Sequence, residues 1–185
     1  MKSKWLVLAF VAVIGFYCWS SYNGLVSSNE AVKSQWQQVE TQYQRRFDLI
    51  PNLVSTVKGA MAQEQKVFGD LAEARTHYAG AGNVADKAAA AGQVEGALGR
   101  LLVVMENYPQ LKSMETVQTL MSQLEGTENR VSVERQRYNE VVQSFNVQIK
   151  RIPTKWIASA AGFTEQKYFE AAAGSENAPV VDFTK

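Results

Sequence analysis

The chain has 185 residues, an ordinary length for a single domain, and its 19 basic residues nearly balance its 18 acidic ones. With this balance the chain has no strong positive potential that would attract nucleic acid or an acidic membrane surface, so we expect no nucleic-acid partner. The single cysteine excludes an internal disulfide framework, and the single histidine argues against a transition-metal site made by the protein.

The N-terminal segment is typical of a membrane anchor. Two lysines precede an apolar run from Trp5 to Trp19, and extension to Val26 supplies the roughly 20 helical residues that a bilayer core of about 30 Å requires. Trp5 at one end, and Trp19 and Tyr22 at the other, stand where interfacial aromatic residues are expected. We therefore predict an uncleaved anchor over residues 1–22.

Two alternatives to this anchor stay open. A cleaved signal peptide also starts with basic residues and a hydrophobic region, although no A-x-A-like site follows and Phe16 and Tyr17 are bulky. A lipoprotein signal would use Cys18, but Tyr17 then stands where a small residue is expected. With an uncleaved anchor, Cys18 faces lipid or packs against a helix.

The basic residues around the anchor predict its orientation. Lys2 and Lys4 precede the span, and only Lys33 lies close behind it. The positive-inside rule therefore favours an N-terminus in the cytoplasm and the remaining chain outside it, in the cell (inner) membrane.

Helical periodicity dominates the first stretch after the anchor. A seven-residue repeat appears in two registers: Leu25, Val32 and Val39, and Trp36, Tyr43 and Ile50. No loop signal separates it from the anchor, so we expect one helix to reach Pro51. An interior proline removes a hydrogen bond and clashes with the preceding turn, at about 3 kcal/mol, which predicts a kink or a new helix at Pro51. The repeat then resumes and ends at a turn over Gly80–Asn83.

Two more long helices are expected beyond this turn. Residues 84–108 are rich in alanine, with an apolar stripe of Val84, Ala88, Ala91, Leu98, Leu102 and Met105. The spacing of Gly92 and Gly96 is that of a close helix–helix contact. Residues 113–150 keep a heptad repeat over five heptads: Val117, Leu124, Val131, Tyr138, Phe145 and Ile152, with Met121, Val142 and Ile149 on the second register.

The C-terminal part shows weaker patterns. A short helix is predicted over 155–161, a second turn over 165–173 and an irregular tail over 175–185, with Val180 and Val181 extended. The fold class is therefore all-α: an N-terminal transmembrane helix followed, over residues 23–174, by an antiparallel bundle of long helices with coiled-coil-like packing.

Charged residues occupy the apolar seam of these heptads. Three are positive and three negative: Arg46, Glu64, Arg75, Glu95, Glu128 and Arg135. Because unpaired buried charge is costly, we expect them to pair across helices, where the planar fork of arginine suits a carboxylate. The alternative is a buried polar site that holds a ligand.

Other chemistry has little support in the sequence. A di-iron bundle needs Glu-x-x-His pairs, whereas His77 is the single histidine and we expect it to be solvated near a helix end. Cys18 lies in the anchor, and neither a Gly-x-Ser-x-Gly motif nor a phosphate-cradling loop occurs. We expect Tyr168 and Phe169 to pack on the end of the bundle. No catalytic, cofactor-binding or metal-binding residue is predicted, and the chain is expected not to be an enzyme.

A series of motifs follows the hydrophobic segment and extends over nearly the whole chain: Tyr22-Asn23-Gly24-Leu25-Val26, Arg45-Arg46-x-Asp48-Leu49-Ile50-Pro51-Asn52-Leu53-Val54, Val57-Lys58-Gly59, Glu64, Ala74-Arg75, Glu106-x-Tyr108-Pro109-x-Leu111-Lys112, Glu128-Asn129-Arg130, Arg135-Gln136-x-Tyr138-Asn139, Phe145-Asn146, Pro153, Gly162-Phe163 and Phe169. In this order the motifs resemble those of the LemA family. One departure is Gly59-Ala60-Met61, where the family leads us to expect an aromatic residue after the glycine.

The resemblance implies a membrane-anchored antiparallel bundle with no established catalytic activity. Five of the six seam charges, all except Glu95, fall within its motifs. We expect a scaffold or adaptor that works by protein–protein contact, with membrane lipid, further copies of itself and unidentified membrane or envelope proteins as partners. The alternative is an extracytoplasmic ligand-binding module that uses the charged seam.

Overall fold

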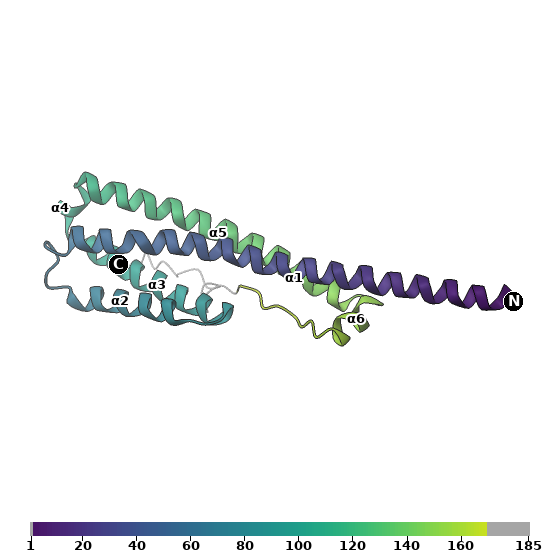
Figure 1. Ribbon diagram of the computed structural model, residues 1–185. Coiled ribbons are helices and arrows are strands. Elements are labelled where there is room, and N and C mark those ends of the chain that lie inside the picture. The colour runs from purple at the N-terminus through teal and green to yellow at the C-terminus, as the bar shows by residue number, and fades with distance from the viewer. Residues whose placement is uncertain (1, 170–185) are drawn as a thin grey trace, which may run out of the picture. The chain divides into compact units, whose positions relative to one another are not determined.

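The computed structural model describes residues 2–169, with side chains from Lys4 onward, and all of its regular secondary structure is helical (Figure 1). The helices are α1 (Lys2–Val57), α2 (Gln65–Gly80), α3 (Val84–Met105), α4 (Pro109–Lys112), α5 (Glu115–Lys150) and α6 (Thr154–Ala160). Residues 163–169 have no regular structure. The rest of the predicted turn and the predicted tail, including Val180 and Val181, lie outside the described residues.

The first helix does not stop at its proline. Helix α1 continues through Pro51 to Val57, so of the two expected outcomes the new helix at Pro51 is wrong and the kink stays a prediction. Pro51 itself is exposed, whereas Ile50 and Leu53 on either side are buried, and this packing holds the helix across the lost hydrogen bond. The chain turns instead over residues 58–64, between α1 and α2.

The described residues divide into two compact units. The first holds residues 2–42 and 130–168, and the second holds residues 43–129 with Phe169. Helices α1 and α5 each contribute to both units.

In the first unit, α1 and α5 bury the apolar faces that the heptads predict. The buried residues are Leu25, Val32, Trp36 and Val39 of α1 and Val131, Tyr138, Val142, Phe145 and Ile149 of α5. The rings of Trp36 and Tyr138 meet nearly edge to face, with centroids 5.5 Å apart. Ile152 is an exception, because α5 ends at Lys150 and leaves the Ile152 side chain 71% exposed.

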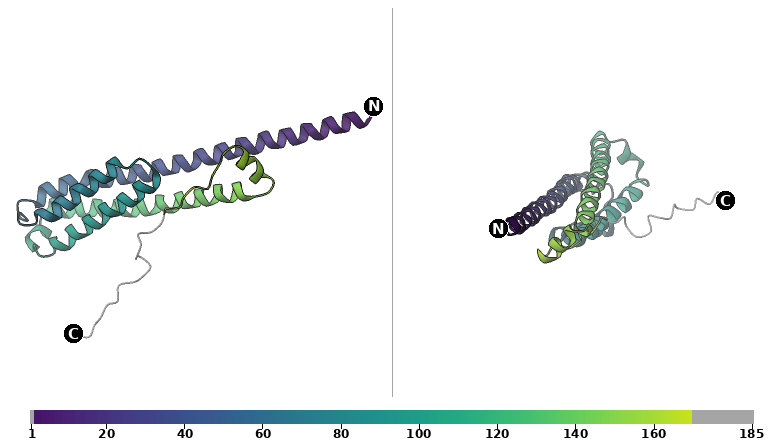
Figure 2. Two further views of the ribbon diagram at one scale, coloured as in Figure 1. Left: turned by 90° about the horizontal axis from the view of Figure 1, so that it is seen from below. Right: turned by 90° about the vertical axis from the view of Figure 1, so that its right-hand side faces the viewer.

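In the second unit, α2 and α3 lie side by side (Figure 2). The buried face of α3 is Ala90, Ala91, Val94, Ala97, Leu98, Leu101 and Met105, a stripe displaced from the predicted one, in which Val84, Ala88 and Leu102 are only half-buried. The close contact expected at Gly92 and Gly96 is wrong, because an ideal Cβ at either position would meet no atom within 4 Å. An aromatic cluster forms where the Tyr78 ring lies 4.8 Å from that of Phe47 and 5.8 Å from that of Tyr43.

Candidate functional site

The N-terminal part of α1 exposes apolar side chains on every side. Residues 4–20 are all exposed, including Trp5 and Trp19, and Tyr22 is exposed as well. By length and composition alone, two described helices could cross a membrane: the stretch of α1 that begins at Lys4, and α3. The apolar window of the first is 0% buried and that of α3 is 39% buried. The burial of α3 is typical of a core helix packed against α2.

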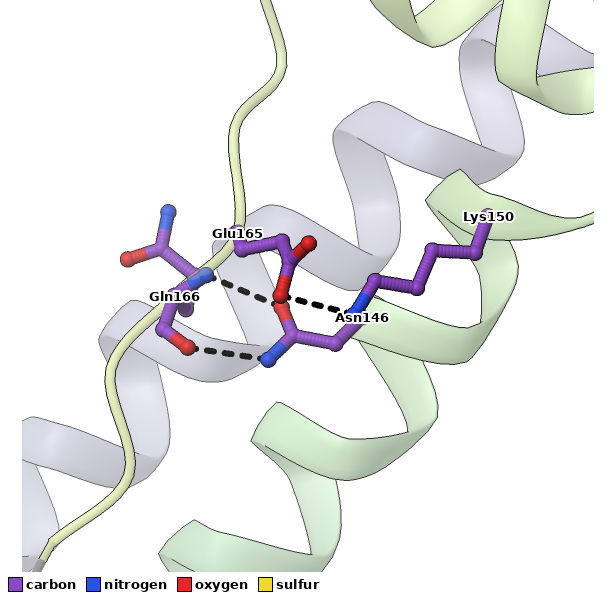
Figure 3. Close-up of polar contacts among 4 residues, drawn as sticks. All are labelled: Asn146, Lys150, Glu165 and Gln166. Carbon is purple, nitrogen blue, oxygen red and sulfur yellow. Dashed lines mark hydrogen bonds and ion pairs between the residues drawn. The ribbon is translucent and has the colours of Figure 1, made fainter.

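A short segment after α6 is fastened to the first unit by polar contacts. We call residues 163–167 the return segment. The side-chain amide of Asn146 donates to the backbone carbonyl of Gln166 and accepts from its backbone N–H, both at 2.9 Å (Figure 3). One turn later, Lys150 forms an ion pair with Glu165, with Nζ 2.7 Å from Oε2.

Two more contacts hold the far end of the return segment. The hydroxyl of Tyr138 donates to the backbone carbonyl of Lys167 at 3.1 Å, and the Gln166 amide donates to Asn29 Oδ1 of α1 at 3.4 Å. Burial raises the pKa of Tyr138, which keeps its hydroxyl protonated as a donor. The return segment is therefore bound to both α1 and α5.

The second unit holds five of the six predicted seam charges. The guanidinium of Arg46 forms an ion pair with the carboxylate of Glu128, with side chains 10% and 42% exposed. This is the pairing across helices that the heptad reading expects, between α1 and α5. Because Arg46 is much the more buried partner, removing Glu128 should cost more than removing Arg46.

The other seam charges lie in mixed surroundings. Glu64 accepts a hydrogen bond of 3.2 Å from the Tyr108 hydroxyl, and burial together with this carboxylate raises the pKa of Tyr108. Arg75 on α2 and Glu95 on α3 are half-buried. Arg135 is also half-buried but belongs to the first unit, on α5.

Candidate metal ligands do not gather in the part of the chain that the structure describes. No group of three or more His, Cys, Asp and Glu side chains there could hold a metal ion. His77 is exposed near the end of α2, with Nδ1 3.2 Å from Gln93 Oε1 and Nε2 3.8 Å from Glu73. Cys18 is a free, exposed thiol in the N-terminal part of α1.

Sequence reasoning missed the contacts that fasten the return segment. Asn146 is 4% exposed although it is an amide next to the heptad residue Phe145. A polar residue beside a buried heptad position is the signal that could have marked it. Its partner Gln166 could not have been found in this way, because the partner groups are backbone atoms of an irregular segment.

Comparison with known proteins shows which protein family the chain belongs to. The sequence profile of the LemA family matches residues 35–183, more than half of the chain. The chain belongs to the LemA family. This confirms the resemblance inferred from the motifs, and the LemA match takes in α1 from residue 35 onward and every later helix that the structure describes.

Three individual proteins are similar to the chain, each at less than 30% identity. Magnetosome protein MamQ 2 and Magnetosome protein MamQ 1 of Paramagnetospirillum magneticum are each 28% identical to the chain over 190 residues, which covers 89% of this chain and 68% of theirs. Magnetosome protein MamQ of Magnetospirillum gryphiswaldense is 27% identical over 174 residues, covering 80% of this chain and 64% of its own.

Proposed function

We propose that this LemA-family chain is a single-pass membrane protein that acts, without catalysis, as a scaffold or adaptor. The N-terminal part of α1 spans the membrane with its N-terminus in the cytoplasm. The two helical units lie outside the cytoplasm and contact other copies of the chain and other membrane or envelope proteins. This proposal combines the anchor, the helical architecture and the relatives.

The contrast between the two parts of α1 carries the proposal. From Leu25 to Val57 the helix buries one stripe and exposes the rest, as a helix does at the surface of a packed domain. From Lys4 to Ser20 it exposes apolar side chains all round, which a bilayer accommodates and water does not.

The finer architecture that we propose is an antiparallel bundle with coiled-coil-like packing. In the first unit, a Cβ on Gly24 would lie 3.4 Å from Gln148, while Trp36 contacts Tyr138. Residue numbers thus rise along α1 as they fall along α5, which supports antiparallel neighbours. The buried heptad residues on both helices support the seam.

A scaffold role agrees with what the helices and the relatives offer. The curated relatives are named as proteins of a structure, the magnetosome, and not for a reaction. Long helices present extended faces of the kind that partner helices use. An anchor also confines copies to two dimensions, which raises their effective concentration and lets weak lateral contacts count.

Two measurements on the full chain test this proposal. After alkaline carbonate extraction of native membranes the chain should stay in the membrane pellet, and its release into the supernatant would refute the span. Crosslinking of co-expressed tagged and untagged chains should then capture mixed oligomers. Recovery of monomer alone at every expression level would refute self-association.

The second function that we keep is ligand binding by charged residues. It is favoured by the partial exposure of Glu64, Arg75 and Glu95 in the second unit, because accessible charges could meet a small ion. The Arg46–Glu128 ion pair and the Tyr108–Glu64 hydrogen bond support a structural role instead. A thermal-shift screen with small anions and metal ions separates the two: a ligand that binds the folded state should raise Tm, and the rise should grow with the logarithm of its concentration once this exceeds Kd.

A further inference from the structure

We propose that the corner between α5 and α6 is a second membrane contact, which docks on anionic lipid headgroups beside the span. We call residues 150–160 the α5–α6 corner. The inference rests on the proposed anchor and adds a lipid-binding surface far from it in the sequence.

The first argument is position within the first unit. The Thr154 side chain lies close to the Tyr17 hydroxyl, and the ring centroids of Tyr22 and Phe163 lie 6.2 Å apart. Figures 1 and 2 both draw α6 against this part of α1. Residues 17–22 are where the apolar run ends and the proposed span meets the headgroups. The α5–α6 corner therefore lies at the level of the membrane surface.

The second argument is the kind of side chain that the corner exposes. Ile152 and Trp156 are 71% and 66% exposed, although they stand about 130 residues beyond the anchor in the chain, whereas Ala158 on the same helix is 2% exposed and faces the protein. Tryptophan is enriched at membrane–water interfaces because its ring is apolar and its N–H is polar. A corner that met only water would have little reason to display both residues together.

The third argument is charge. The corner, residues 150–160, contains three basic side chains, Lys150, Arg151 and Lys155, and no acidic one, and the next acidic residue in the chain is Glu165. Glu165 is already paired with Lys150, while Arg151 and Lys155 are exposed beside Trp156. Basic residues next to an exposed tryptophan are typical of segments that lie on anionic bilayers. The near-neutral balance of the whole chain conceals this local excess.

The test uses the full chain with Cys18→Ser, reconstituted into phosphatidylcholine vesicles with or without phosphatidylglycerol. Single cysteines carry a bimane fluorophore, and spin-labelled lipid quenches any fluorophore that meets the bilayer. Ser159→Cys reports on the corner and leaves Trp156 in place. Val133→Cys is the matched control, an exposed site of the same unit on α5, about 25 Å of helix before Lys150. Ile14→Cys reports on the span.

We expect strong quenching at Ile14→Cys and none at Val133→Cys. At Ser159→Cys we expect headgroup-depth quenching that is several-fold stronger in vesicles with phosphatidylglycerol. Arg151→Glu with Lys155→Glu should reduce the Ser159→Cys signal to that of Val133→Cys, with the helical circular dichroism unchanged. As a control, Lys58→Glu with Lys66→Glu reverses two charges that are exposed in the second unit, and it should leave the quenching at Ser159→Cys unchanged.

Failure of the corner and failure of the anchor give different results. Quenching at Ile14→Cys without quenching at Ser159→Cys would overturn the corner and leave the span standing. Absence of quenching at Ile14→Cys would overturn the span itself. Equal quenching in both kinds of vesicle would overturn the anionic headgroup as the ligand. Shielding of Ser159→Cys from aqueous iodide without quenching by lipid would mean that a protein covers the corner, which also overturns the proposal.

Discussion

The side chain of Asn146 pairs with the backbone of Gln166 as a neighbouring strand would, giving one hydrogen bond and taking another, both at 2.9 Å. One amide thereby satisfies both backbone groups of a residue that lies in no helix. The pair fixes the return segment on α5 and, through Gln166 and Asn29, on α1. It is therefore the contact whose loss should loosen this part of the first unit first.

Replacing Asn146 tests that dependence. Asn146→Ala leaves the N–H and carbonyl of Gln166 without this partner, and we expect a loss of about 2 kcal/mol in the free energy of unfolding. Cleavage by trypsin after Lys167 should become faster at the same time. Gln143→Ala, an exposed change on α5, is the control. Unchanged cleavage and stability in Asn146→Ala would show that the return segment is held elsewhere.

The Arg46–Glu128 ion pair predicts an asymmetric effect of mutation. Glu128→Ala removes the carboxylate from a guanidinium whose side chain is only 10% exposed, and we expect a loss of about 3 kcal/mol. Arg46→Met leaves a carboxylate that is 42% exposed and can meet water, so we expect about 1 kcal/mol. Chemical denaturation of both single variants and the double variant measures this difference. Equal losses, or a larger one for Arg46→Met, would contradict the burial argument.

Pro51 lies inside α1 on an exposed position, so its replacement by alanine should stabilise the helix. Alanine restores a backbone donor and is favoured over proline by about 3 kcal/mol in a helix interior. We expect the free energy of unfolding to rise by about 1–2 kcal/mol of this amount. Ser55→Ala, on the same helix and also exposed, should change stability by less than about 0.5 kcal/mol. A destabilised Pro51→Ala would mean that packing of the neighbouring residues depends on a local bend.

Burial of Tyr138 predicts a loss of stability in base. Its pKa is raised, so the folded state favours the neutral phenol more than the unfolded state does. The resulting stability is complete below the unfolded pKa of about 10 and is lost as the pH rises through the higher folded pKa. Tyr138→Phe removes the hydrogen bond to the Lys167 carbonyl and should lower the free energy of unfolding by about 1 kcal/mol at neutral pH. The variant should also show a smaller decrease in this free energy above about pH 10.

The measurement for this prediction is urea unfolding at a series of pH values, with Tyr168→Phe as the control at an exposed tyrosine. The Tyr168→Phe control should follow the parent protein throughout. A parent protein whose stability does not change between neutral pH and pH values above about 10 would contradict the assigned effect of burial. Tyr108, whose pKa is also raised, contributes in the same direction.

Periodicity predicted the buried faces of the long helices well, because burial along a helix repeats with the sequence. Leu25, Val32 and Val39 are buried as expected, and so are Tyr138 and Phe145. The position of the break after α1 could not be found in the same way. A local rule favours Pro51, whereas the packing of its neighbours keeps the helix intact to Val57.

The candidate site was less predictable than the helices, because its contacts join distant and irregular segments. The sequence marks Arg46 and Glu128 as seam charges, and these two do meet. Nothing local indicates that Thr154 should lie beside Tyr17. The positive-inside rule counts basic residues that are close to the span in the sequence. It therefore does not include the basic residues of the α5–α6 corner, which lie near the end of the apolar run only in the folded chain.

Within the first unit, helix α1 runs without interruption from Lys2 to Gln42, a length of about 62 Å. A continuous helix has no joint at which its apolar part could turn or tilt independently of the part that packs on α5. In the proposed topology, a thinner bilayer makes the span lean further from the normal, and the first unit leans with it. For a chain with this proposed span, bilayer thickness should therefore set the angle at which the first unit faces its surroundings.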